Sequence, residues 1–111
     1  MDYYEAWFDL KDSAEDMKLC EAVDTYMGYL QAKGLIEGWR LRRRKLGFAP
    51  DGWCEFNLTI SCLDLQQLEN AFQRAASRDS EVEPLHRDVY KRVVNAKFAL
   101  YRDFPDAVRV R

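Results

Sequence analysis

The most regular pattern in the chain is the alternation of apolar and polar side chains in WCEFNLTISC, residues 53–62. Every second residue from Cys54 to Cys62 is apolar, and the residues between them are polar or charged. This period of two predicts a β-strand with one buried face and one polar face. In a sheet built from such strands, only the apolar face must be buried against other elements. The pattern therefore favours an antiparallel sheet with helices on a single face.

Three further segments are predicted to be strands. Residues 3–10 are rich in aromatic side chains, 36–46 alternate arginines with apolar residues, and 97–101 read KFALY. The Pro-Asp-Gly turn at 50–52 predicts that 36–46 and 53–62 form an antiparallel hairpin.

Helices are predicted between these strands. The first is expected to begin at Ser13-Ala14-Glu15-Asp16, which resembles a capping box, and to end at Gly34. Its apolar stripe consists of Met17, Cys20, Val23, Met27 and Leu30.

Two more helices are expected before the last strand. Asp64 is predicted to cap the first of them. Ser80-Glu81-Val82-Glu83 resembles a second capping box, with Pro84 in the first turn of the next helix. The apolar stripes comprise Leu65, Leu68, Phe72, Ala75 and Ala76 in one helix, and Leu85, Val89 and Val93 in the other.

The order of these elements predicts an α+β fold of the ferredoxin-like type. It reads β-α-β-β-α-(α)-β, the split βαβ arrangement with an additional helix before the last strand. The antiparallel sheet is expected in the order 4-1-3-2, within a single domain over residues 1–111.

The composition of the chain limits its expected cellular location and the partners, metals and cofactors that it could bind. No apolar run approaches the roughly 20 residues of a membrane span, and the acidic start MDYYEAWFDL does not resemble a signal peptide, so we expect a cytoplasmic protein without a membrane partner. Three cysteines without a CxxC motif and a single histidine argue against a zinc site. We expect neither a metal nor a cofactor, and no Gly-rich phosphate loop or nucleophile elbow is visible.

The polar face of the predicted sheet carries the candidate ligand-binding residues. Arg40 and Arg42 could hold a carboxylate or phosphate through paired hydrogen bonds, and aromatic side chains beside them could pack against a ring. The carboxylates and the amide of this face, together with His86, are the candidates for proton transfer, although no catalytic residue is identified. His86 is expected on the third helix, on the far side of the sheet, where a surface or boundary histidine is the favoured interpretation. The binding candidates are Tyr3, Glu5, Trp7, Asp9, Arg40, Arg42, Trp53, Glu55 and Asn57.

Three long segments of the chain resemble a known superfamily. EAWFDLK, GWRLRRRKLGF with GWCEFNLTI, and VYKRVVNAKFALYRDFP are similar to the dimeric α/β-barrel superfamily of ferredoxin-like proteins, and within it to a small bacterial branch of unknown function. That superfamily includes the antibiotic-biosynthesis monooxygenase-like and stress-responsive barrel families. The resemblance implies a homodimer that pairs through its sheet faces into a barrel. If the chain is an enzyme, it implies cofactor-free oxygenase or isomerase chemistry, but it carries over no catalytic residue.

Alternatives remain at this point. The charges on the polar face could satisfy one another at an interface, and the chain could be a structural or partner-binding module whose arginine-bearing tail docks elsewhere. The RNA-recognition fold shares the same element order, but its second stacking aromatic on the third strand is replaced here by Glu55. That carboxylate repels phosphates, and the net charge is −2, so nucleic-acid binding is disfavoured. The small polar or anionic ligand is the preferred hypothesis.

Overall fold

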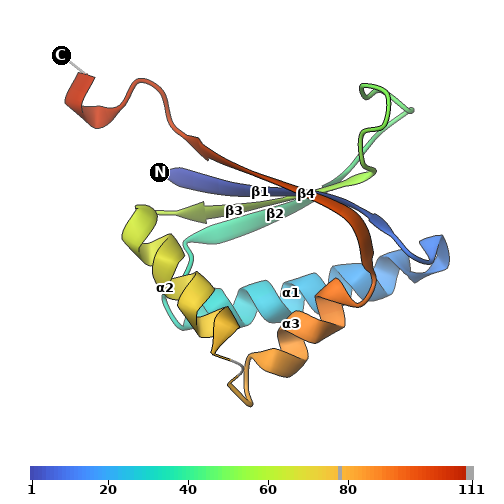
Figure 1. Ribbon diagram of the computed structural model, residues 1–111, viewed down its shortest axis with the longest axis horizontal. Helices are drawn as coiled ribbons and strands as arrows, with labels where there is room; N and C mark the ends of the chain where they lie inside the picture. Colours follow the sequence, from blue (N-terminus) through green and yellow to red (C-terminus); the bar gives the residue numbers. More distant parts are fainter. Residues whose placement is uncertain (78, 110–111) are drawn as a thin grey trace.

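The computed structural model describes residues 1–77 and 79–109, which form a sheet with helices packed beneath it (Figure 1). The strands are β1 (Asp2–Leu10), β2 (Gly38–Arg43), β3 (Phe56–Cys62) and β4 (Val93–Arg102). The helices are α1 (Asp16–Ala32), α2 (Leu65–Ala76) and α3 (Glu83–Tyr90), with short 3-10 turns at Ser13–Glu15 and Ala107–Arg109.

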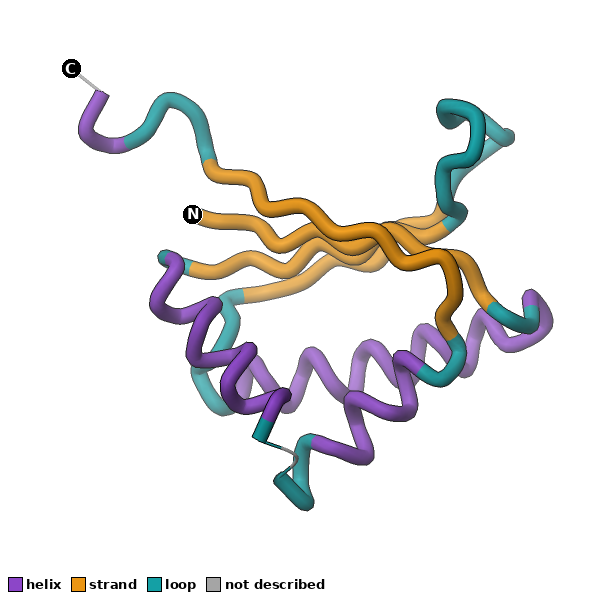
Figure 2. Tube along the Cα trace, in the orientation of Figure 1, coloured by secondary structure: helices purple, strands orange, loops and turns teal. Residues whose placement is uncertain are grey.

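The sheet has the predicted topology. Its strands follow the order β2-β3-β1-β4, and every neighbouring pair is antiparallel. The helices lie together on one side of the sheet, so its other side, which we call the open face, is left without a helical cover (Figures 1 and 2). The ferredoxin-like α+β prediction is confirmed.

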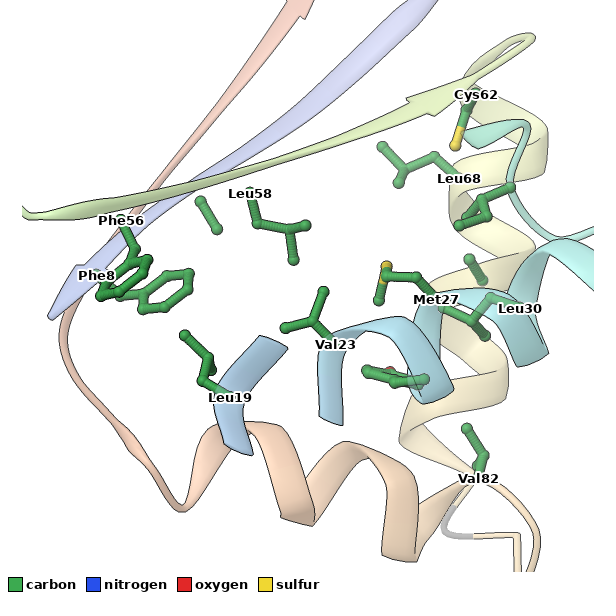
Figure 3. Close-up of a cluster of buried hydrophobic side chains, with 14 residues drawn as sticks. Phe8, Leu19, Val23, Met27, Leu30, Phe56, Leu58, Cys62, Leu68 and Val82 are labelled. Atoms are coloured by element: carbon green, nitrogen blue, oxygen red, sulfur yellow. The ribbon is translucent and has the colours of Figure 1, made fainter. Parts of the chain in front are cut away.

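The core lies between the helices and the apolar face of β1 and β3. Phe8 pairs with Phe56 across the two strands, and their rings stack with centroids 5.7 Å apart. From α1, Leu19 and Val23 reach this cluster with no exposed surface (Figure 3). Because the side chains of β1 and β3 alternate between the faces, this burial fixes which residues must lie on the open face.

The first helix differs from its prediction at its start. Asp12, not Ser13, caps the 3-10 turn Ser13–Glu15, because its carboxylate accepts a hydrogen bond from the backbone N–H of Ala14 over 3.0 Å. The predicted stripe is buried from Val23 to Leu30, whereas Met17 is 67% exposed and Leu19 and Tyr26 are buried in addition. Gly34 follows the helix with a φ of +73°, in the left-handed conformation that the predicted stop requires.

Of the two caps predicted for the later helices, the one at Asp64 is confirmed and the one at Ser80 is wrong. Asp64 caps α2 by accepting the N–H of Gln67 over 2.9 Å. Ser80 does not cap α3; Val82 occupies that position and is fully buried. The last strand also begins earlier than predicted, at Val93, because the third helix ends at residue 90.

The connection between the second and third strands is longer than predicted. Strands β2 and β3 stop pairing at residues 43 and 56, and residues 44–55 form what we call the β2–β3 loop, with Gly47 and Gly52 at positive φ. The segment after β4, residues 103–109, is called the tail and ends in a 3-10 turn. Residues 110 and 111 lie outside the described part.

A buried carboxylate ties the first and last strands together. Asp2 is 3% exposed, and its oxygens accept hydrogen bonds of 2.6 and 3.3 Å from Nε and Nη2 of Arg102. This hydrogen-bonded pairing lowers the pKa of the Asp2 carboxyl below its ordinary value, although burial acts in the opposite direction. The pairing joins residues 100 positions apart in sequence.

The helix phase predicts unequal effects of two truncations on α1. Leu19→Ala removes a fully buried side chain and should lower the free energy of unfolding by about 2–5 kcal/mol. Met17→Ala, two residues away and largely exposed, should change it by less than about 0.5 kcal/mol. Urea unfolding followed by circular dichroism measures both. Equal losses would contradict the observed phase.

The Asp2–Arg102 pair predicts a dependence of stability on pH. Because the folded pKa of Asp2 is depressed, its stabilisation is present above the ordinary value of 3.8 and disappears as the pH falls through the folded pKa. Asp2→Asn should therefore be less stable than the wild type near neutral pH, and the difference should shrink in acid. Urea unfolding between about pH 2 and pH 7 tests this, with Asp51→Asn in the exposed loop as the control. A difference that does not change with pH would refute it.

Candidate functional site

The open face holds a polar hollow of about 480 Å³, which we call the polar basin. It lies over β1, β3 and β2, where the alternation of the strands sends hydroxyl, carboxylate and guanidinium groups to one side. Its lining consists of Tyr3, Glu5, Gly38, Trp39, Arg40, Arg42, Thr59 and Ser61.

The two predicted arginines both reach the basin but differ in their contacts. In the strand register Arg40 lies opposite Thr59, and Arg42 lies opposite Asn57. Arg42 donates to the Asn57 side-chain oxygen over 2.6 and 3.2 Å and to the Thr59 hydroxyl over 3.3 Å. Arg40 is exposed and makes no hydrogen bond or ion pair within the described residues. The basin therefore contains a cation whose donors face solvent.

Asn57 separates the positive and negative groups of the basin. Its amide nitrogen donates to Glu5 Oε1 over 3.0 Å, while its oxygen accepts from Arg42. Thr59 donates to the same Glu5 oxygen over 2.7 Å. Arg42 thus contacts neutral oxygens, and its charge is not matched by a direct carboxylate contact.

The next arginine turns to the other side of the sheet. Arg43 donates to Glu55 over 2.7 Å and to Asp16 over 3.2 Å, and its guanidinium lies 5.1 Å from the centre of the Phe56 ring. This ion pair directs the Glu55 carboxylate away from the basin. In the strand register Arg43 lies opposite Phe56. Its side chain therefore points to the other side of the sheet from Arg40 and Arg42, as the alternation predicts.

The predicted aromatic residues divide between two places on the open face. Tyr3 lines the basin, and a hydrogen bond to Asp103 raises the pKa of its phenol. Trp7 and Trp53 pack edge to face farther along the sheet, with ring centroids 5.5 Å apart. Lys97 lies 6.0 Å from the centre of the Trp53 ring and adds a cation there.

Asp9 serves the backbone of the neighbouring strands instead of the basin. Its carboxylate accepts the N–H of Glu55 over 2.8 Å and the side-chain amide of Asn95 over 3.3 Å. Asn95 has a φ of +60° at an irregularity in the pairing of β1 with β4, and its carbonyl accepts a hydrogen bond from the buried Cys54 thiol. These contacts hold the start of β3 against the bulged end of β4.

A second hollow lies on the helix side of the sheet. We call it the apolar cleft; it measures about 300 Å³ and opens between the sheet and the three helices. His86 lies at this cleft between two tyrosine rings, at centroid distances of 5.8 Å from Tyr26 and 5.1 Å from Tyr90. Burial and the nearby Glu83 raise the pKa of Tyr26 to about 12. Other residues that line the cleft include Tyr4, Phe72, Ala75, Ala96 and Phe98.

Sequence reasoning placed His86 on the helix side but did not anticipate the cleft. The missed signal is the excess of aromatic residues on the helices and on the apolar face of β4. Phe72 and Phe98 remain 42% and 59% exposed, because α2 and α3 leave part of the last strand uncovered. On the open face, Thr59 and Ser61 were on the expected polar side but were not among the predicted ligand-binding residues.

The described residues also bear on metal binding and membrane insertion. Within residues 1–77 and 79–109, the His, Cys, Asp and Glu side chains do not gather in groups of three or more that could hold a metal ion. No described helix combines the length and the apolar character needed to cross a membrane.

Comparison with known proteins identifies the family. The family model of DUF6614, a family of unknown function, matches residues 1–111, and the chain belongs to this family. No curated protein matches it significantly.

The fold is shared with several solved structures. An Arabidopsis thaliana protein matches with a TM-score of 0.72 at 7% identity, covering 93% of this chain and 95% of its own. A dimeric ferredoxin-like protein of unknown function from Jannaschia sp. CCS1 has a TM-score of 0.67 at 8% identity, covering 92% and 98%. A dimeric protein of unknown function and ferredoxin-like fold from Bacteroides fragilis has a TM-score of 0.57 at 11% identity, covering 92% and 95%.

These likenesses show the fold alone. They confirm the resemblance to dimeric ferredoxin-like proteins, whereas the narrower relation to monooxygenase-like and stress-responsive barrels stays a prediction.

Proposed function

We propose that the chain forms a homodimer through its open face and that the polar basin binds a small anionic molecule. The observation that carries this proposal is Arg40, an exposed guanidinium without a partner in the described part of the chain. The dimeric ferredoxin-like proteins that share this fold support the pairing.

Pairing of the sheets makes the unpartnered arginine chemically important. Two open faces packed together would remove water from the basin, and an unpaired buried charge costs several kcal/mol. An anion held by Arg40 offsets this cost through charge-assisted hydrogen bonds, which are strongest with a carboxylate or phosphate. The Ser61 hydroxyl supplies a further donor, and the Tyr3 ring supplies an apolar wall.

The other predicted residues take supporting roles in this proposal. Arg42 and Asn57 form the side of the basin next to Glu5, which rejects a second negative group. Trp7 and Trp53 provide aromatic surface where the two sheets meet. Asp9 and Glu55 hold the strand ends in position.

The anion site predicts a selective effect of Arg40→Ala. Inorganic phosphate or benzoate should raise the melting temperature of the wild type, because a ligand that binds the folded state stabilises it. Loss of the Arg40 guanidinium should weaken that binding about 10-fold or more, since a hydrogen bond to a charged group contributes about 1.5–3 kcal/mol. Thermal shift titrations measure the effect.

The control is Arg87→Ala, which removes an exposed guanidinium from α3 on the helix side of the sheet and should leave anion binding unchanged. Equal losses in both variants would reduce the effect to net charge. An absence of any shift across a panel of carboxylic acids and phosphates would contradict the proposal. A wild-type protein that sediments as a monomer at micromolar concentration would contradict the dimer.

The apolar cleft supports a second candidate function, the binding of a small uncharged aromatic molecule. Its volume of about 300 Å³ is at the lower end of the range for ligand pockets, and its lining is mostly aromatic and aliphatic with His86 and tyrosine hydroxyls as polar groups. This site lies on the opposite side of the sheet from the basin. The two sites can therefore be tested separately.

The cleft predicts that a larger residue at position 75 will exclude an aromatic probe. Ala75 lines the cleft, whereas its neighbour Ala76 is exposed and does not. Ala75→Leu should weaken binding of 2-naphthol by about 10-fold or more, and Ala76→Leu should not change it. Fluorescence titration measures both. Equal binding to the two variants would refute the cleft site.

A further inference from the structure

Two segments project from the sheet on its open side. The β2–β3 loop rises from one end of the sheet and the tail from the other, while the helices lie on the opposite side (Figures 1 and 2). The loop leaves the sheet beyond the Phe8–Phe56 pair, and the tail leaves it beyond the Asp2–Arg102 pair. They therefore stand at the two ends of the surface that the proposed homodimer would cover.

Both segments carry large apolar side chains that the chain itself leaves in solvent. In the loop, Leu46 and Phe48 are 83% and 81% exposed. In the tail, Phe104 and Val108 are 92% and 90% exposed. Isolated exposed apolar residues are ordinary, but pairs at the tips of projecting segments indicate contact with another molecule.

We propose that each tail packs against the β2–β3 loop of a second copy of this chain, so that the two copies hold each other at both ends. This inference rests on the homodimer proposed above and names the residues that close it. It follows from the positions of the segments, their exposed tips and their charges.

Two symmetric arrangements bring the projecting segments of the two copies into contact. A two-fold axis that runs across the strands turns the partner end for end, so its tail meets the first copy's loop. An axis that runs along the strands sets tail against tail and loop against loop. In the first arrangement the contact between tail and loop occurs twice, once at each end of the interface. In the second, one end holds tail against tail and the other holds loop against loop.

The charges of the segments favour the contact between tail and loop. The base of the loop carries Arg44 and Lys45, whereas the tail carries Asp103 and Asp106. The two aspartates are more than half exposed even though Asp103 approaches the N-terminal amine and Asp106 approaches Arg102. Tail against loop brings opposite charges together, and the other arrangement brings like charges together.

Other charges in the segments do not reverse this preference. Glu55 at the end of the loop is already paired with Arg43, and Asp51 and Arg109 place one opposite charge in each segment. Lys45 makes no ion pair among the described residues, which leaves its ammonium available for the partner's tail.

Disulfide trapping tests the arrangement directly. In a Cys20→Ser background, which removes the partly exposed thiol, the double variant Phe48→Cys/Phe104→Cys should form a covalent dimer under mild oxidation. Neither single variant should do so, because tail would have to meet tail or loop meet loop. Phe48→Cys combined with Met17→Cys, on the helix side, is the matched control and should not cross-link.

Each outcome decides between the proposals. Cross-linking in the double variant but in neither single variant supports the inference. Cross-linking of Phe104→Cys alone overturns it in favour of tail against tail. No cross-link in a sample that sediments as a dimer overturns it but leaves the proposed homodimer standing, whereas a monomeric sample overturns both.

A second measurement does not depend on disulfide geometry. Phe48→Asp and Phe104→Asp should each raise the dissociation constant of the dimer at least 10-fold, because buried aromatic anchors dominate interfaces. Met17→Asp, which changes an equally apolar exposed residue on α1, should leave the constant unchanged. Analytical ultracentrifugation measures the constants, and circular dichroism checks the fold. Unchanged constants in both phenylalanine variants would overturn the inference.

Discussion

The structure depends on the burial of one side only of the β1–β3 pair. The stacked rings of Phe8 and Phe56, with Leu19 and Val23 beneath them, fix the face on which the helices lie. A shift of one residue in the register would exchange the two faces of the shifted strand, so this packing also fixes which polar groups of β1 and β3 lie on the open side. The polar basin is therefore a consequence of how the core is packed.

The two hollows lie on opposite sides of the sheet and differ in their lining: the basin is polar and charged, and the cleft is mostly apolar. On the open side, hydroxyl, amide and guanidinium groups stand on strands, where neighbouring side chains are held at fixed spacing. On the helix side, aromatic rings surround a hollow because two short helices do not cover all of β4. The two proposed binding sites therefore differ in chemistry and lie on opposite sides of the sheet.

Much of the fold could be predicted from periodicity. The alternation in residues 53–62 identified the central strand, and the element order identified the sheet topology and the side that the helices cover. The start of α1 could not be predicted, because Asp12 rather than Ser13 caps a 3-10 turn before the helix, and Met17 in its first turn is exposed. The start of β4 at Val93 was missed because that residue also fits the spacing of the preceding helix.

The sequence predicted which side of the sheet the candidate site residues share, but not the contacts that they make. Alternation placed Arg40, Arg42 and Glu5 together, but it carries no information on which oxygens each guanidinium contacts. Glu55 lies just before the start of β3, where its carboxylate pairs with Arg43 instead of facing the basin. The apolar cleft depends on how far α2 and α3 extend along β4, which local patterns do not determine.

The position of Asn57 has a consequence for how the basin responds to its surroundings. A carboxamide neither gains nor loses a proton in ordinary solution, so the link that it makes from Arg42 to Glu5 does not titrate. It presents its oxygen to the cation and its nitrogen to the anion, and this polarity fixes the orientation of the amide. The residue thus acts as an electrically neutral spacer that keeps two opposite charges from collapsing into a direct pair.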